Sequence, residues 1–183
     1  EALDRGIATV YQDLVFVFFM SVACNFFMGR EPIRKMWGVI PVMDHALAAR
    51  TSQAKLEEMG IRIRDADQMI GTMSGGERQC LAIARAIHFG AKVLILDEPI
   101  AALGVKQSVN VLKLISKARQ RGIAVIFITH NVNHAYPIAD SFTLLNRGKS
   151  LGTYLKSEVS KEAVLDMMAG GAEMQTLMAE LDG

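Results

Sequence analysis

Apolar and polar residues along the chain follow two periods, one typical of strands and one typical of helices. Short runs rich in Val and Ile occupy residues 6–12 (GIATVYQ), 92–99 (KVLILDEP) and 123–130 (IAVIFITH), and each leads into polar residues; they predict three strands. The last two runs are continuously apolar and therefore predict strands buried on both faces. Residues 105–120 place apolar side chains at helical spacing between them, which predicts a parallel strand–helix–strand unit.

Three further segments predict two helices and a hairpin. Residues 41–60 are rich in Ala, Leu, Met and Glu, and Pro41 suits the start of a helix. Residues 77–89 (ERQCLAIARAIHF) carry apolar side chains along one side of a second helix. Residues 141–155 (SFTLLNRGKSLGTYL) predict a hairpin that turns at residues 146–148.

The longest apolar run is LVFVFFMSVACNFFM, residues 14–28. It contains Ser21 and Asn25 and is short for a membrane span of about 20 residues, so a transmembrane segment is the least favoured interpretation. The run predicts a buried strand-to-helix segment, a docking face for another protein, or both.

The start of the helix at residues 77–89 is unusual. Ser74 and Glu77 have the spacing of a capping box. Gly75 and Gly76 follow the cap, where each glycine costs roughly 1 kcal/mol relative to Ala. Because a helix that only needed a start would not select two glycines, we expect another group to approach this backbone closely, and a helix N-terminus favours an anion.

Polar side chains follow each of the three predicted strands: Gln12, the pair Asp97 and Glu98, and His130. The carboxyl ends of parallel strands are where open α/β sheets bind ligands. One acid after a buried strand is weak evidence, since such strands often end in a charged turn. Together with a glycine-rich helix start, however, these residues indicate phosphoryl transfer, with one carboxylate for Mg²⁺ and a second acid beside it.

Composition excludes several classes of protein. Of the 183 residues, 51% are hydrophobic and 21% charged, which predicts a folded chain. The net charge of +1 gives no electrostatic basis for a nucleic-acid partner. Two cysteines, Cys24 and Cys80, without a signal peptide suggest free thiols in a reducing compartment.

Four motifs occur in an order that resembles the ATPase subunit of an ATP-binding cassette (ABC) transporter. VYQD (10–13) resembles the glutamine loop, MSGGERQ (73–79) the signature motif, VLILDEP (93–99) Walker B, and ITH (128–130) the switch histidine. Within the family, segments such as SVACNFFMGRE (21–31) look most like bacterial carbohydrate importers of the fructose or ribose type.

The resemblance implies an α/β fold: part of a P-loop NTPase (ABC ATPase) fold, with a mostly parallel sheet flanked by helices and an inserted helical lobe. We expect one domain over residues 1–183 in three parts. Residues 1–13 and 80–155 form the nucleotide-binding core lobe, and residues 14–79 form the helical lobe with the signature. Residues 156–183 form a helical tail, broken at a pair of glycines.

The resemblance also implies roles for the residues that follow the strands. Asp97 would hold Mg²⁺ through water, and Glu98 would be the general base that orients the attacking water. His130 would contact the γ-phosphate of ATP. Gln12 would touch the metal and sense the membrane subunit.

The partners come from the same resemblance. Ser74, Gly75 and Gly76 would face the γ-phosphate of ATP held by a second copy of the subunit, in a head-to-tail dimer. The glutamine loop and the apolar run after it would receive a cytoplasmic helix of the transmembrane permease. A periplasmic sugar-binding protein would be an indirect partner, and the subunit would be cytoplasmic, on the inner face of the bacterial inner membrane.

The chain departs from the family pattern in several places. A P-loop of the form G-x-x-x-x-G-K-[ST] is missing; the only Gly-Lys-Ser, residues 148–150, falls in the predicted hairpin and is a decoy. The resemblance implies that Glu1 lies past the P-loop, in a fragment or truncated product that would bind and hydrolyse ATP poorly by itself. Ile100 stands where Thr or Ser is usual, and Gly104 where aspartate is common.

Other classes of protein remain to be weighed. Chromosome-maintenance and DNA-repair ATPases place a long coiled coil between glutamine loop and signature, but residues 13–73 show no sustained heptads. Translation-linked relatives carry two cassettes and a basic linker. The serious alternative is a non-hydrolysing cassette remnant that binds partners but not ATP.

Overall fold

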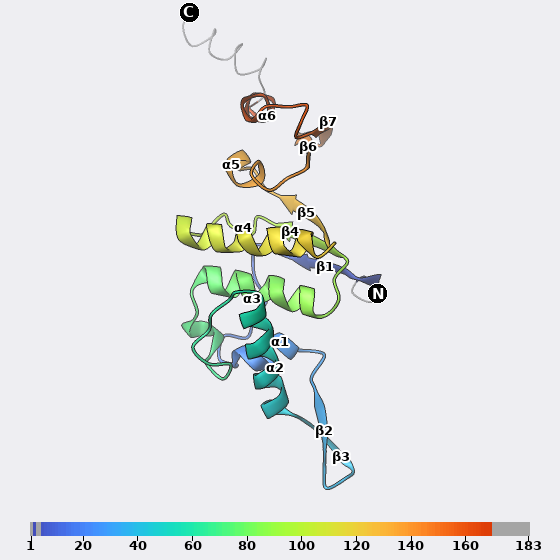
Figure 1. Ribbon diagram of the computed structural model, residues 1–183, viewed down its shortest axis with the longest axis vertical. Coiled ribbons are helices and arrows are strands. Elements are labelled where there is room, and N and C mark those ends of the chain that lie inside the picture. Colours follow the sequence, from blue (N-terminus) through green and yellow to red (C-terminus); the bar gives the residue numbers. More distant parts are fainter. Residues whose placement is uncertain (1, 3–4, 170–183) are drawn as a thin grey trace, which may run out of the picture. The chain divides into compact units, whose positions relative to one another are not determined.

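The computed structural model describes residue 2 and residues 5–169 (Figure 1). The chain divides into two compact units, with the boundary between Ile128 and Thr129. The expected break in the helical tail, at residues 170–171, lies outside the described residues.

The first unit is built on a parallel three-stranded sheet. Its strands lie in the order β1 (Ile7–Val10), β4 (Val93–Asp97) and β5 (Ala124–Ile128). Ile7 pairs with Val93, which pairs with Ala124, so the three strands begin level with one another. Helix α4 (Val105–Gln120) links β4 to β5, which confirms the predicted strand–helix–strand unit.

Among the described residues of this unit, the helices cover one face of the sheet. Ala8, Val10, Leu94 and Leu96 are buried on the face where helices α3 (Gly75–His88) and α4 pack against each other. On the opposite face, alternate residues of β5 such as Ile126 remain exposed. The prediction that β5 is buried on both faces is therefore wrong, because both helices lie on the same side of the sheet.

Helix α3 confirms the second predicted helix and its cap. The Ser74 hydroxyl accepts a hydrogen bond from the Glu77 N–H at 3.3 Å, and the Glu77 carboxylate accepts one from the Ser74 N–H at 2.7 Å. The helix starts at Gly75, two residues before the predicted segment. Near its end, Arg85 donates to the carbonyl oxygens of Phe26 and Met28 at 2.9 and 2.6 Å, which ties α3 to helix α1 (Val22–Phe27).

The segment from 33 to 60 differs from the predicted helix over 41–60. Its first part is an antiparallel hairpin of β2 (Ile33–Met36) and β3 (Ile40–Met43), and helix α2 (His45–Glu58) begins only afterwards. Pro41 lies in β3 opposite Lys35, in a two-stranded ribbon where its missing N–H is tolerated. The Asp44 side chain caps α2 by accepting from the Leu47 N–H at 2.9 Å.

Outside the β2–β3 hairpin, residues 14–79 form helices and irregular segments. Besides α1, α2 and the start of α3, they include a 3-10 turn, η2 (Ile70–Thr72). The apolar run 14–28 was expected to be a buried strand followed by a helix. The helix is present as α1, but residues 14–20 form an irregular segment with exposed side chains such as Val15 and Phe19, so the strand part of the prediction is wrong. Across the described residues, no helix combines the length and apolar character needed to span a membrane. The division of the chain into lobes stays a prediction.

The second unit contains the predicted hairpin. Strands β6 (Ser141–Asn146) and β7 (Lys149–Leu155) pair antiparallel, with positive φ at Arg147 (45°) and Gly148 (77°) in the turn. The described part of this unit also contains two short helices, α5 (Val132–Ala135) and α6 (Lys161–Met168). Its core consists of Val132, Phe142, Leu144, Val159 and Val164. The Gly-Lys-Ser segment therefore lies in a hairpin turn, as predicted.

Candidate functional site

The two predicted acids lie at the carboxyl end of the central strand. Asp97 is the last residue of β4, half-buried, and pairs with Ile128 of β5. Glu98 follows it with φ +44°, and its N–H donates to the Ile128 carbonyl oxygen at 3.0 Å. A non-glycine residue at positive φ is uncommon and costs roughly 1–2 kcal/mol. Such strain persists where the surroundings impose it, typically at functional sites.

The turn after these acids accommodates both departures from the family pattern. Ile100 is 1% exposed, so the apolar side chain belongs to the core. Gly104 caps α4: its N–H donates to the Gln107 side-chain oxygen at 3.3 Å, and its carbonyl oxygen accepts from the Ser108 hydroxyl at 3.2 Å. Both positions therefore have a structural role within the first unit.

Gln12 and His130 follow the other two strands. Strand β1 ends at Val10, opposite Leu96, so Gln12 lies beyond the same edge of the sheet as Asp97, in an exposed bend. His130 is exposed two residues after β5, in the second unit. The structure thus brings Gln12 and the two acids to one edge of the sheet, whereas the predicted role of His130 remains a prediction.

Packing within the first unit explains why glycine occupies positions of the signature. A Cβ built on Gly76 would lie 2.7 Å from the Gln107 Cβ of α4, and one built on Gly75 would lie 3.3 Å from the Leu103 Cδ2. Since real Cβ contacts below 3.0 Å essentially do not occur, Gly76 is required where α3 meets α4. The expectation of a close approach to this backbone is met by α4. Contact of Ser74, Gly75 and Gly76 with a phosphate stays a prediction.

Residues of α4 that sequence reasoning missed line a cavity beside the signature. The cavity has a volume of about 400 Å³ and is bordered by Ser74 and Gly76 of the signature and by Gln107, Asn110 and Lys113 of α4. The sequence does contain a signal for these residues: polar side chains recur every three residues from 107 to 113, along one side of the helix. The stripe places amide and ammonium groups, which suit a polar or anionic ligand, next to the start of α3.

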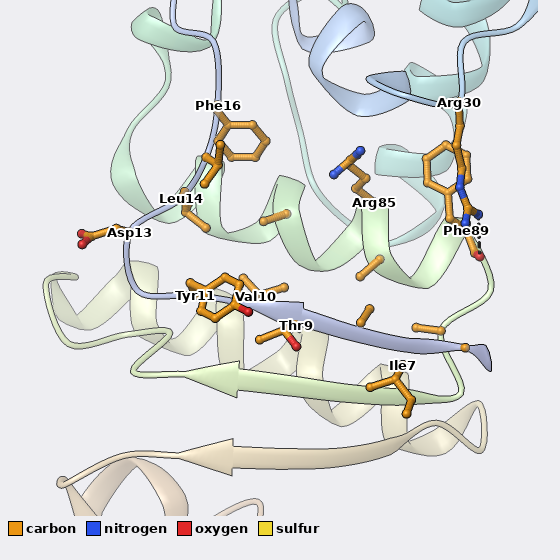
Figure 2. A pocket seen from close by; sticks show the side chains of 16 residues that line it. Ile7, Thr9, Val10, Tyr11, Asp13, Leu14, Phe16, Arg30, Arg85 and Phe89 are labelled. Atoms are coloured by element: carbon orange, nitrogen blue, oxygen red, sulfur yellow. Dashed lines mark hydrogen bonds between the residues drawn. The ribbon is translucent and has the colours of Figure 1, made fainter. Parts of the chain in front are cut away.

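A second, more apolar pocket lies along the outer edge of β1, which is an edge strand of the described sheet (Figure 2). Its volume is about 250 Å³, and its lining includes Leu14 and Phe16 of the segment after Gln12 and Arg85 and Phe89 at the end of α3. Burial, followed by the charge of Arg30, lowers the pKa of the Arg85 guanidinium. The pocket offers apolar surface beside an edge strand of the described sheet.

The apolar run after Gln12 is held by one buried amide. Asn25 is 2% exposed; its side chain accepts from the Val17 N–H at 2.9 Å and donates to the carbonyl oxygens of Val17, Met20 and Ser21 at 3.0–3.3 Å. The run therefore has a defined backbone although Phe19 is 88% exposed. Phe18 is partly covered by Arg78, whose guanidinium lies 5.4 Å from the ring centre.

Sequence comparison finds relatives over most of the chain. A sequence model described as ABC transporter matches residues 1–101, more than half of the 183. The fructose import ATP-binding protein FrcA of Rhizobium meliloti is 41% identical over 177 residues, covering 94% of this chain and 68% of that protein. The xylose/arabinose import ATP-binding protein XylG of Sulfolobus acidocaldarius is 34% identical over 172 residues, covering 94% and 66%.

Other relatives are much longer than this chain. A Burkholderia cenocepacia protein, provisionally named a ribose/galactose/methyl galactoside import ATP-binding protein, is 37% identical over 170 residues. The match covers 93% of this chain but only 32% of that relative, so the chain spans about a third of its length.

Solved structures share the fold. The ADP conformation of MJ1267, an ATP-binding cassette of an ABC transporter, superposes with a TM-score of 0.69 at 19% identity, covering 91% of this chain and 66% of that one. The dimeric post-hydrolysis state of the cassette MJ0796, bound to ADP and Pi, has a TM-score of 0.64 at 22% identity, covering 82% and 62%. The likeness confirms the predicted α/β class with a parallel sheet flanked by helices. Family match, relatives and fold agree: this chain belongs to the ABC transporter family, as an ATPase domain of the kind that binds ATP.

Proposed function

We propose that the chain is part of the subunit that hydrolyses ATP to power a bacterial sugar importer. Relatives at 34–41% identity are named as fructose and xylose/arabinose import ATP-binding proteins, which supports a sugar as the transported substrate. The observation that carries the proposal is the strained Glu98 at the end of β4. Its φ of +44° and the hydrogen bond from its N–H to Ile128 fix the backbone of this acid at the ligand-binding edge of the sheet.

In this proposal Glu98 is the general base. It accepts the proton of the attacking water and orients that water toward the γ-phosphate of ATP. Held by the β4–β5 hydrogen bond, the Glu98 backbone needs no reorganisation when the reaction occurs. His130 would contact the γ-phosphate, and Gln12 would report on the membrane subunit from its exposed bend.

Mg²⁺ fits the available donors. No group of three His, Cys, Asp or Glu side chains that could hold a metal occurs within the described part of the chain. Nucleotide-bound Mg²⁺ needs only one or two protein carboxylates, because phosphates and waters supply its other ligands. Asp97, half-buried at the strand end, would be that carboxylate, and Gln12, after the neighbouring strand at the same edge of the sheet, would be a further ligand. The ion would neutralise charge on the phosphates.

Two further features of the first unit suggest the partners. Ser74, Gly75 and Gly76 at the start of α3 would face ATP held by a second copy, with the helix N-terminus directed at the γ-phosphate. The pocket along β1 and the exposed Val15 and Phe19 would receive a cytoplasmic helix of the transmembrane permease. The subunit would then lie in the cytoplasm on the inner membrane face, linked through the permease to a periplasmic sugar-binding protein.

The test is Glu98→Gln in the polypeptide that carries this chain, assayed with its permease. ATP and Mg²⁺ should still bind, while turnover falls by about 10²–10⁴-fold, as is typical when a general base is removed. Glu57→Gln, at an exposed position of α2, is the matched control and should turn over normally. Wild-type turnover in Glu98→Gln would place the base elsewhere. No turnover in the parent protein would favour the alternative of a non-hydrolysing cassette remnant.

Uptake assays address the substrate. Cells that express the importer should accumulate labelled fructose, ribose or xylose in an ATP-dependent manner, and Glu98→Gln should abolish that accumulation. Normal ATPase activity with no uptake of any of these sugars would leave the ATPase assignment in place and refute the sugar.

A further inference from the structure

The β2–β3 hairpin exposes an unusual amount of apolar surface. Trp37 is 83% exposed, Val39 77% and Ile33 67%, and Ile40 is exposed as well. Figure 1 shows the hairpin extending away from the helices of its own unit. A two-stranded ribbon without a core is only marginally stable in water, and clustered exposed apolar residues mark interaction sites. The hairpin therefore calls for an external partner.

The turn does not explain the tryptophan at its tip. Trp37 and Gly38 both have positive φ, 51° and 79°, and the Val39 N–H donates to the Met36 carbonyl oxygen at 3.3 Å. Turns with positive φ at both central residues strongly prefer Asn-Gly or Asp-Gly, because a bulky residue is strained there. Trp37 therefore works against the local backbone preference, which points to a role for its side chain outside the turn.

Basic side chains lie on both faces of the ribbon. Arg34 and Lys35 are consecutive in β2, so they point to opposite faces, and each is exposed opposite an apolar residue of β3. Residues 32–43 contain no acidic side chain. Each face thus combines one positive charge with apolar side chains.

We propose that this hairpin inserts its Trp37 tip into the interfacial layer of a bilayer that contains anionic phospholipid, with Arg34 and Lys35 among the headgroups. Tryptophan prefers the membrane–water interface, and basic residues bind anionic headgroups electrostatically. A docked protein would cover one face of the ribbon and leave the charge on the other face unmatched. A headgroup layer surrounds both faces at once.

Trp37 is the chain's only tryptophan, so its fluorescence reports directly on the tip. The 183-residue chain is mixed with phosphatidylcholine vesicles that contain or lack phosphatidylglycerol. The emission should shift to the blue only with phosphatidylglycerol, and added salt should reverse the shift, since screening weakens attraction to the surface. A blue shift that grows with protein concentration in the absence of vesicles would show self-association and overturn the proposal. So would no shift on anionic vesicles.

Vesicle flotation then separates the contributions. Trp37→Asn suits the turn better than Trp, so the hairpin should keep its fold while binding weakens about tenfold or more. Arg34→Gln with Lys35→Gln should weaken binding roughly 30-fold, since each basic residue near an anionic surface contributes about fivefold.

The matched control is the other hairpin. Arg147→Gln with Lys149→Gln removes the same two charges from the β6–β7 turn, which also has a positive-φ residue followed by glycine but no aromatic tip. This variant should bind anionic vesicles within about twofold of the parent chain, because its charges lie outside the proposed contact. Equal losses in the two double variants would mean that net charge alone drives binding, and would overturn the proposal for the hairpin.

Discussion

One added methyl group tests why the signature helix begins with glycines. Gly75 and Gly76 are consecutive residues in the first turn of α3, yet their surroundings differ. A Cβ at Gly76 would meet Gln107 at 2.7, 3.0 and 3.3 Å, and the nearest of these atoms is the Gln107 Cβ, fixed to the α4 backbone. A Cβ at Gly75 would meet only the end of the flexible Leu103 side chain at 3.3 Å.

The expected magnitudes follow from these contacts. Gly76→Ala gains up to about 1 kcal/mol of helix propensity but forces α3 and α4 apart, and overpacking typically costs about 1–3 kcal/mol. We expect a net loss of about 1–2 kcal/mol in the free energy of unfolding, which lowers Tm by about 2–4 °C for each kcal/mol at this chain length. Gly75→Ala should be neutral within about 0.5 kcal/mol or slightly stabilising.

Urea denaturation followed by far-UV circular dichroism measures both variants under identical conditions. A second change identifies the atom responsible: Gln107→Ala keeps the clashing Cβ and should not rescue Gly76→Ala, whereas Gln107→Gly removes it and should. If Gly76→Ala proved as stable as Gly75→Ala, the α3–α4 contact would not require glycine. The presence of both Gly75 and Gly76 would then have to be explained by a bound ligand alone.

Three further outcomes test other parts of the structure. Phe19→Asp should weaken assembly with the permease while leaving the fold intact, because Phe19 is almost fully exposed; co-purification measures the assembly, and a proportional loss of thermal stability would mean that the variant damages the fold and not a docking contact. Asn25→Ala should destabilise the chain by about 1–3 kcal/mol in urea titration, since it removes a buried amide and leaves the Val17 N–H without its acceptor; a change below about 0.5 kcal/mol would mean that water replaces the amide. Burial, followed by the charge of Glu77, raises the pKa of the Cys80 thiol from 9.0 to about 11. Because the folded chain then holds this proton more tightly than the unfolded chain, the free energy of unfolding should fall as pH rises from 9 to 11, and Cys80→Ala should flatten that decline. Thiol titration of the folded chain should label Cys24 and spare Cys80, and rapid labelling of both would contradict the burial.

Features that depend on neighbouring residues were predictable. The capping box of Ser74 and Glu77, helix α4 and the β6–β7 turn all satisfy backbone groups within a few residues, so their signals lie in short stretches of sequence. Helix α2 was predicted to start at Pro41 and starts at His45. Proline suits a helix start and an isolated ribbon alike, and the pairing of β2 with β3 decides between them.

The sequence by itself determined the order of the motifs, the family they belong to, and the strands that present Gln12, Asp97 and Glu98 at one edge of a sheet. Only the tertiary structure decided that both helices cover the same sheet face, that Glu98 has a left-handed backbone, and that Gly76 makes room for Gln107. The physical reason is the range of the interactions. Caps and turns are closed by hydrogen bonds over three or four residues, whereas these three features depend on contacts or constraints between segments about 30 residues apart in the chain.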